Sequence, residues 1–214
     1  MKTVIVNGGN IDYDFALSFF QTHTVDYVIA ADHGAEFLYR AGICPDELVG
    51  DFDSADQGIL PYYEERKIPI RRFRPEKDST DMEIAMLTAL ERGSTKITVL
   101  GATGSRLDHV LGSIRNLSIP LKYGVDCEIL DSHNRIRMVD QSITICKKDQ
   151  FGKYVSLLAH GGPVEHLTLK GFYYPLSDYR LEADCAMGIS NEITDEEAEI
   201  RFERGRLLVI ESRD

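Results

Sequence analysis

With 214 residues, 43% of them hydrophobic, the chain is long enough for one large domain or two small ones. Its net charge of -11 argues against nucleic acid or an anionic membrane as the main partner, because both require a basic surface. No stretch approaches the ~20 apolar residues of a membrane span, and the first nine residues lack the features of a signal peptide. The four cysteines stand far apart without metal-ligand spacing, which is typical of reduced residues in a cytoplasmic protein.

The first two thirds of the chain alternate short apolar runs with segments of helical periodicity. Strands are expected at residues 4–6, 27–31, 47–50, 68–73, 96–100 and 127–130. Helices are expected at residues 12–20, 35–41, 54–67, 80–93 and 106–117. Pro61 should bend or break the third helix, and Thr80 and Glu83 match a capping box at the start of the fourth. This alternation predicts an α/β fold with a mostly parallel, doubly wound sheet and helices on both faces.

From about residue 135 the helical periodicity disappears. Short β-branched runs follow at residues 136–139, 142–146, 154–158, 164–169, 198–202 and 207–210. Gly, Asp or Lys turns separate them, so this part is expected to form an antiparallel β-sandwich. The change of pattern places a domain boundary between residues 131 and 134, which gives domains at 1–132 and 133–214.

Polar clusters follow five of the predicted strands. They are Asn7 with two glycines, Asp32, Asp51 with Asp53, residues 77–81, and residues 101–108. In parallel sheets ligands bind beyond the carboxyl ends of the strands, so one site at this edge is a simpler account than five independent turns.

Asp51 and Asp53 point the same way if their backbone is extended, and two such carboxylates repel each other unless a cation lies between them. Together with Asp32 and Asp81 they form the hard oxygen set that suits Mg²⁺. An acidic turn with Ser54 capping the next helix fits the same pair, and the helix macrodipole alone favours Asp81. A metal site and an acidic turn therefore both remain open from these residues.

Two further segments of this edge could meet phosphate. Lys77, next to Asp78, supplies a mobile cation. The loop at residues 101–106 carries two glycines before a helix, and Arg106 could clamp phosphate oxygens in bidentate fashion. The loop matches neither a Walker nor a dinucleotide motif, so a plain tight turn is the alternative. His109 could be a base or a structural residue of the helix start.

Residues 171–176 gather aromatic side chains where a turn should be polar, and residues 188–192 place small polar groups after a glycine. Aromatic rings with Ser190 and Asn191 would suit a flat heteroaromatic ligand. A core or dimer contact for the first segment and an ordinary turn for the second explain them equally well.

In combination these motifs resemble the thiamine pyrophosphokinase (thiamine diphosphokinase) family over nearly the whole chain. The resemblance is carried by residues 31–35, 45–54, 77–83, 101–109, 171–176 and 190–191. It implies an ATP-binding catalytic α/β domain at 1–132 and a thiamine-binding β-sandwich at 133–214. It also implies Mg²⁺-dependent transfer of the pyrophosphoryl group of ATP to the hydroxyethyl oxygen of thiamine, giving thiamine diphosphate and AMP. The family resemblance further implies a homodimer whose active sites lie between one chain's α/β domain and the partner's sandwich.

The resemblance also implies roles for individual residues. Metal ligation falls to Asp32, Asp51, Asp53 and Asp81, and the catalytic set is Asp51, Asp53, Asp81 and Arg106. ATP binding falls to Asn7, Asp32, Lys77, Asp78, Thr80, Gly101, Thr103, Gly104, Arg106, Asp108 and His109. Thiamine binding falls to Ser190, Asn191, Tyr173 and Tyr174.

The chain departs from the usual family pattern at His33, Glu36 and Ser105, where the family favours Gly, Asn and Gly. These departures add side-chain atoms where the family has close backbone approach, so nucleotide preference or rate could differ. Two other functions remain open from the residues: a metal-dependent phosphohydrolase acting on a nucleotide-like substrate, and a non-catalytic nucleotide or thiamine sensor.

Overall fold

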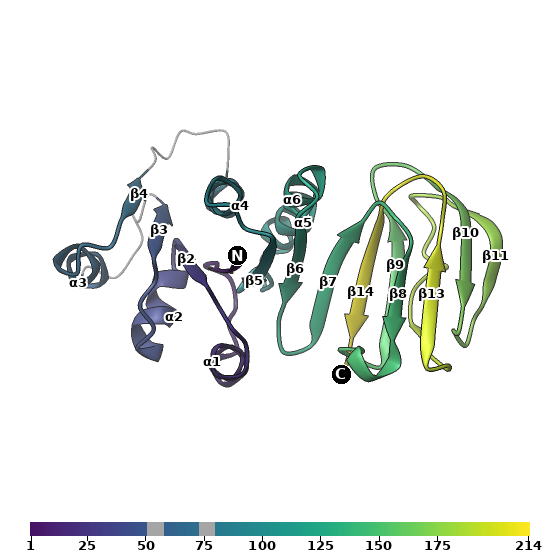
Figure 1. Cartoon of the computed structure of the whole chain (residues 1–214), viewed down its shortest axis with the longest axis horizontal. Coiled ribbons are helices and arrows are strands. Elements are labelled where there is room, and N and C mark those ends of the chain that lie inside the picture. The colour runs from purple at the N-terminus through teal and green to yellow at the C-terminus, as the bar shows by residue number, and fades with distance from the viewer. Residues whose placement is uncertain (51–57, 73–79) are drawn as a thin grey trace. The chain divides into compact units, whose positions relative to one another are not determined.

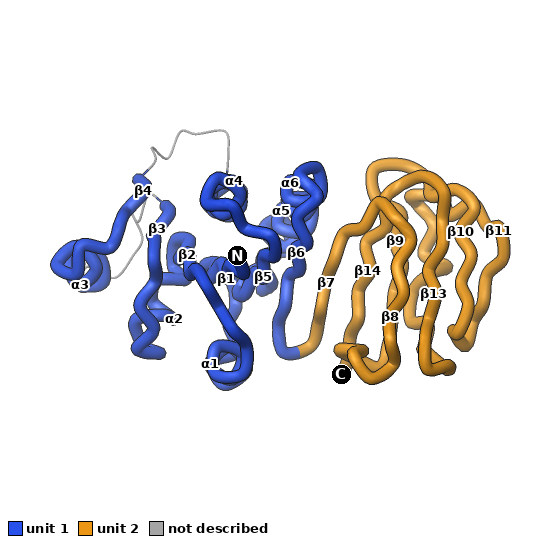
Figure 2. The backbone as a smooth tube through the Cα atoms, in the orientation of Figure 1, with its two compact units in different colours: residues 1–132 blue, residues 133–214 orange. Residues whose placement is uncertain are grey.

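The computed structural model describes residues 1–50, 58–72 and 80–214 (Figure 1). The chain divides into two compact units, residues 1–132 and 133–214 (Figure 2). In the described ranges, none of the helices combines the length and apolar character that crossing a membrane requires.

The first unit is built on a parallel sheet. Its strands are β1 (Lys2–Val6), β2 (Tyr27–Ala31), β3 (Glu47–Gly50), β4 (Ile70–Arg72), β5 (Lys96–Leu100) and β6 (Asp126–Leu130). They lie in the order β4-β3-β2-β1-β5-β6, and every neighbouring pair is parallel. Ile5, Ile29 and Val99 are fully buried, as expected for strands covered on both faces. The predicted parallel α/β sheet is confirmed.

The order of these strands contains one reversal. From β1 the chain steps outward through β2, β3 and β4, and it then returns to the other side of β1 to form β5 and β6. The connections after β1 and β5 therefore leave the sheet in opposite directions. A crevice opens beyond the carboxyl ends of strands at such a switch point, and ligands of open α/β sheets bind there.

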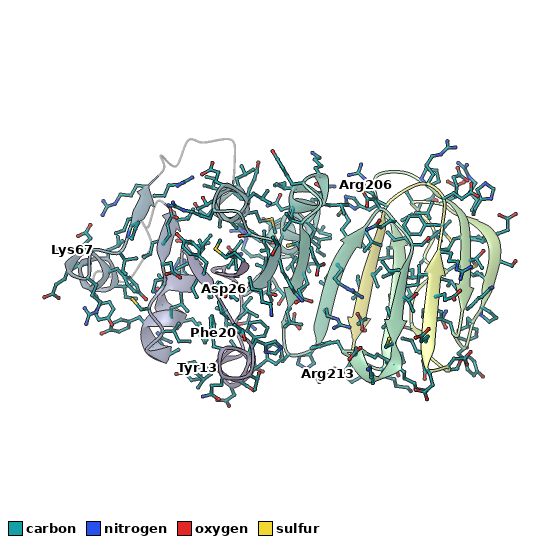
Figure 3. The ribbon with its side chains drawn as sticks, in the orientation of Figure 1. Tyr13, Phe20, Asp26, Lys67, Arg206 and Arg213 are labelled. Atoms are coloured by element: carbon teal, nitrogen blue, oxygen red, sulfur yellow. The ribbon has the colours of Figure 1, made fainter. Side chains whose placement is uncertain are left out.

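Helices cover both faces of the sheet (Figure 1). They are α1 (Tyr13–Thr22), α2 (Gly34–Ala41), α3 (Ile59–Glu65), α4 (Asp81–Glu91), α5 (Leu107–Asn116) and α6 (Ser118–Lys122). Helices α1 and α2 share one face, where Tyr13 and Phe20, both labelled in Figure 3, contact Phe37 of α2 with ring centroids 5.6 and 6.5 Å apart. Helices α4, α5 and α6 contact one another on the opposite face (Figure 1).

Two helix predictions have different outcomes. Thr80 caps α4 as expected, since its hydroxyl oxygen accepts a hydrogen bond from the Glu83 backbone N–H at 3.2 Å. The expectation that Pro61 bends or breaks α3 was wrong. The helix begins at Ile59, so Pro61 lies in the first turn, where its missing N–H costs no intrahelical hydrogen bond.

The second unit is an antiparallel β-sandwich. Its strands are β7 (Asn134–Val139), β8 (Ile143–Cys146), β9 (Tyr154–Ala159), β10 (Val164–Lys170), β11 (Leu176–Leu181), β12 (Asn191–Glu192), β13 (Glu197–Arg201) and β14 (Leu207–Ser212), with a 3-10 helix at Lys147–Asp149. The sheets β12-β9-β14-β7 and β11-β10-β13-β8 bury one common core that includes Leu157, Ile200 and Val209. The predicted sandwich is confirmed, with β11 and β12 as additional strands.

Candidate active site

A cavity of about 880 Å³ lies at the switch point of the parallel sheet. It is formed by the segments after β1, β2 and β5, the start of α4 and the first turns of α5. Its lining residues are Asn7, Gly8, Gly9, Asn10, Asp32, His33, Thr80, Asp81, Met82, residues 101–106, residues 108–110, Gly112 and Ser113. The volume is in the range of small-molecule and cofactor sites.

Backbone hydrogen bonds join the loops after β1 and β5 along one wall of this cavity. The N–H groups of Asn7, Gly9 and Asn10 donate to the carbonyl oxygens of Leu100, Gly101 and Thr103 at 2.8, 2.8 and 2.7 Å. A Cβ atom at Gly9 would collide with the Gly101 carbonyl oxygen, and Gly101 itself has φ +71°. These glycines are therefore required for the two loops to approach so closely, which brings backbone rather than side chains to the wall.

Asp32 follows β2 and adopts the left-handed conformation, with φ 48°. Its Oδ2 accepts a hydrogen bond from His33 Nδ1 at 2.7 Å, and its Oδ1 is buried without a hydrogen-bond partner among the described residues. A buried carboxylate oxygen without a donor costs roughly 1–3 kcal/mol or more. A cation is the natural partner for such an atom, so the chemistry of this residue fits a metal ligand.

Asp81 is the first residue of α4, directly after the Thr80 cap. Helices α4 and α5 meet at this point, because Asn116 Nδ2 of α5 donates to the Thr80 hydroxyl oxygen at 3.3 Å. The Asp81 carboxylate and the N-terminus of α4 therefore both lie at the cavity. The positive end of the helix dipole favours anionic ligands there.

Arg106 lies at the start of α5 and pairs with Asp108. Its Nε and Nη2 donate to the two carboxylate oxygens at 3.3 and 2.5 Å, and the hydrogen bond holds the pKa of Asp108 below its usual range. His109 Nε2 lies 4.0 Å from the same carboxylate, and all three side chains are exposed. An exposed pair of this kind contributes little to stability, so the guanidinium can exchange it for another oxyanion at small cost.

Several cavity residues carried too weak a signal in the sequence to be assigned. Asn10, Gly112 and Ser113 line the cavity, and Gly112 and Ser113 lie one helical turn after His109. Asp131 accepts a hydrogen bond from the Thr103 hydroxyl at 2.8 Å and so holds the loop after β5. Helical spacing from His109 could have indicated Ser113, whereas the contact of Asp131 depends on the pairing of β5 with β6.

The predicted site residues fall into three groups. Ten of them line the cavity at the switch point: Asn7, Asp32, Thr80, Asp81, Gly101, Thr103, Gly104, Arg106, Asp108 and His109. Asp51, Asp53, Lys77 and Asp78 lie outside the described residues. The third group, Tyr173, Tyr174, Ser190 and Asn191, belongs to the second unit.

In the second unit, hydrogen bonds join Asn191 to Tyr174 and Ser190 to Ser156. Asn191 Nδ2 donates to the Tyr174 carbonyl at 2.8 Å, and Asn191 Oδ1 accepts from the Tyr174 N–H at 3.0 Å. Ser190 has φ 59°, and its N–H donates to the Ser156 hydroxyl at 3.0 Å. The rings of Tyr173 and Tyr174 are exposed and pack edge to face, with centroids 4.8 Å apart. The buried Asn191 amide thus fixes the backbone beneath an exposed aromatic pair.

Known proteins match both units. Residues 21–129 match the thiamin pyrophosphokinase catalytic domain, and residues 141–207 match the thiamin pyrophosphokinase vitamin B1 binding domain. The thiamine pyrophosphokinase of Bacillus subtilis (strain 168) is 34% identical over 217 residues, with 100% of each chain covered. This chain belongs to the thiamine pyrophosphokinase family. As a member of the thiamine pyrophosphokinase family it is an enzyme that transfers the pyrophosphoryl group of ATP to thiamine, giving thiamine diphosphate and AMP.

Solved structures of thiamine pyrophosphokinases agree in fold. The crystal structure of the Bacillus subtilis enzyme superposes with a TM-score of 0.89 at 32% identity and 100% coverage of both chains. That of Geobacillus thermodenitrificans gives 0.86 at 30% identity, covering 100% of this chain and 98% of the other. The structure of the yeast enzyme superposes with a TM-score of 0.82 at 17% identity, covering 99% of this chain and 86% of the other. At this identity the similarity shows only that the fold is shared. Of the three functions left open by the residues, family membership supports pyrophosphoryl transfer.

Proposed function

We propose that the cavity at the switch point is where this enzyme binds the triphosphate of ATP with Mg²⁺ and transfers the pyrophosphoryl group. The observation that carries the proposal is that Asp32, Asp81 and Arg106 line one cavity together with the glycine loops after β1 and β5. Phosphoryl chemistry depends mainly on positioning and on neutralising the charge of the phosphate oxygens. Carboxylates for a metal, backbone N–H groups and a guanidinium are the groups that this chemistry uses.

Asp32 and Asp81 would hold Mg²⁺, with Asp51 and Asp53 as further ligands predicted from the sequence. The fit rests on Asp32, whose buried Oδ1 lacks a hydrogen-bond partner in the described part of the chain. When bound, Mg²⁺ would neutralise charge on the phosphates and hold them in line with the acceptor. The role of the four aspartates is to anchor and orient rather than to act as nucleophile or base.

Residues around the metal would bind the nucleotide. Arg106 would leave Asp108 and fork onto phosphate oxygens, while the backbone at Gly101 and Gly104 approaches the triphosphate. The remaining predicted contacts to ATP are Asn7, Lys77, Asp78, Thr80, Thr103, Asp108 and His109. Residues 1–132 would thus form the ATP-binding catalytic domain.

Residues 133–214 would form the thiamine-binding domain. Tyr173 and Tyr174 present exposed rings for a flat heteroaromatic ligand. Asn191 bonds to the Tyr174 backbone, and Ser190 precedes it in the chain. We assign Asn191 to holding the tyrosine pair, because its amide oxygen and nitrogen bond to the Tyr174 backbone.

The enzyme would act as a homodimer in the cytoplasm, with active sites at the subunit interface. Each unit exposes apolar side chains of the kind that subunit contacts bury: Leu107 and Leu111 on α5, and Met187 and Ile189 in the second unit. All four cysteines are free thiols, in keeping with a reducing compartment.

Metal removal tests the proposal. Purified enzyme treated with a chelator and incubated with ATP and thiamine should form no AMP, and adding Mg²⁺ should restore AMP and thiamine diphosphate in equal amounts. The fold should survive the treatment, which circular dichroism would check. Undiminished AMP formation in metal-free buffer would overturn the assignment of Mg²⁺.

A further inference from the structure

His33 is the cavity residue whose contact the function described above does not explain. It lies at the N-cap position of α2, yet its side chain makes no capping hydrogen bond to that helix. Its Nδ1 instead lies 2.7 Å from Asp32 Oδ2. Because a carboxylate can only accept a hydrogen bond, Nδ1 is the protonated nitrogen and the donor in this contact.

The chain after β1 leaves room for this pair. A Cβ atom at Gly8 would lie 3.2 Å from the His33 Cβ and 3.3 Å from Asp32 Oδ2, which is tighter than ordinary van der Waals contact. Asp32 itself sits in the left-handed conformation, which fixes the direction in which its side chain leaves the backbone. The imidazole then supplies the hydrogen bond that selects one orientation of the carboxylate.

We propose that His33 is a positioning residue that acts through Asp32: it holds the carboxylate in place before metal and nucleotide bind. This rests on the proposed function, in which Asp32 is a metal ligand. Carboxylates that bind metals are themselves held by hydrogen bonds, and removing such a partner typically weakens metal affinity about 10–100-fold. The histidine therefore replaces conformational freedom of Asp32 with a preset geometry.

Two amide substitutions separate this role from direct contact between the imidazole and a ligand. In His33→Asn the amide nitrogen occupies the place of Nδ1, so the hydrogen bond to Asp32 can be kept. In His33→Gln the amide extends to the place of Nε2, so a contact from the far side of the ring can be kept while the Asp32 hydrogen bond is lost. His33→Ala removes both.

The experiment measures Mn²⁺ binding to the full-length protein by electron paramagnetic resonance, in the presence of a non-hydrolysable ATP analogue. We expect His33→Ala and His33→Gln to weaken Mn²⁺ binding about 10–100-fold. The Mn²⁺ affinity of His33→Asn should stay within a few-fold of that of the wild-type protein. The KM for Mg²⁺-ATP should rise in His33→Ala and His33→Gln and stay nearly constant in His33→Asn, and kcat should change less than KM. Thermal unfolding of each variant checks that the fold is retained, and the Asn and Gln pair remains informative if the Ala variant does not fold.

The outcomes distinguish this proposal from the one it rests on. Suppose that Asp32→Asn weakens Mn²⁺ binding, as the proposed metal site requires. Unchanged Mn²⁺ affinity in His33→Ala, or affinity restored by Gln instead of Asn, would then overturn the positioning role of His33. If Asp32→Asn also leaves Mn²⁺ affinity unchanged, the proposed metal site is wrong and the role of His33 falls with it.

Discussion

Arg106 and Asp108 form a two-pronged ion pair at the start of α5, in which Nε and Nη2 of the guanidinium each donate to one carboxylate oxygen. The side chains are 69% and 64% exposed, so water competes for both groups and the pair is easily exchanged. Asp108 holds the guanidinium of Arg106 at the cavity. Its two carboxylate oxygens accept from the guanidinium in the same bidentate way as two oxygens of a phosphate would.

Arg106→Lys should lower kcat/KM for Mg²⁺-ATP about 100-fold, because an ammonium cannot form the planar fork that contacts two phosphate oxygens. Stability should change little, since the side chain is exposed. Initial rates of AMP formation with saturating thiamine measure the effect. Arg115→Lys, a matched exposed arginine in the last turn of α5, should retain full activity. Equal rates for both variants would remove Arg106 from the catalytic set.

Asn191→Ala should raise the KM for thiamine about tenfold and leave the KM for ATP nearly unchanged. The Asn191 amide bonds to the N–H and the carbonyl of Tyr174, and the substitution removes both hydrogen bonds. The exposed Tyr173–Tyr174 pair is therefore held less firmly. Asn191→Asp is the matched variant, because it keeps the acceptor for the Tyr174 N–H and replaces the donor to the Tyr174 carbonyl with a carboxylate oxygen that repels it. Steady-state kinetics in each substrate separate the two constants. Parallel increases in both KM values would point to a general loss of structure.

Gly34→Ala should destabilise the protein by about 3 kcal/mol or more, because a Cβ atom there would overlap the Val6 carbonyl of β1. The close contact seats the start of α2 against the strand that ends at the cavity. Gly112→Ala in α5 provides the control, since a Cβ atom at that position meets nothing within 4 Å and should stabilise the helix by up to ~1 kcal/mol. Urea unfolding of both variants gives the comparison. Similar midpoints would show that the first turn of α2 can move away from β1.

Local patterns account for what the sequence could predict. Buried parallel strands such as β2 and β5 read as unbroken apolar runs, and the Thr80 cap needs only neighbours in the chain. Strands β11 and β12 and helix α6 lacked such a pattern, and β12 has only two residues. Strand β11 exposes most of its polar residues and has few apolar positions to mark a period, and α6 is a five-residue helix that contains Pro120.

The site could be predicted as a set of strand ends but not as a set of contacts. Sequence spacing brings Asp32 and Asp81 to the same edge of the sheet, because parallel strands share one carboxyl end. It cannot show that His33 turns towards Asp32, that Arg106 is held by Asp108, or that Thr103 bonds to Asp131 from the neighbouring strand. Those contacts depend on side-chain rotamers and on strand order, which are fixed only when the chain folds.

In the proposed active site, carboxylates at the carboxyl ends of the strands organise pyrophosphoryl transfer. The most direct test compares Asp32→Asn and Asp81→Asn with Asp26→Asn, which changes an exposed aspartate at the opposite, amino end of β2 (Figure 3). Each variant is incubated with Mg²⁺, ATP and thiamine, and the AMP and thiamine diphosphate formed are both measured by chromatography. We expect the first two variants to lose at least about 100-fold in turnover with the fold intact, and Asp26→Asn to match the unchanged enzyme. Full turnover in both Asp32→Asn and Asp81→Asn would contradict this assignment of the active site.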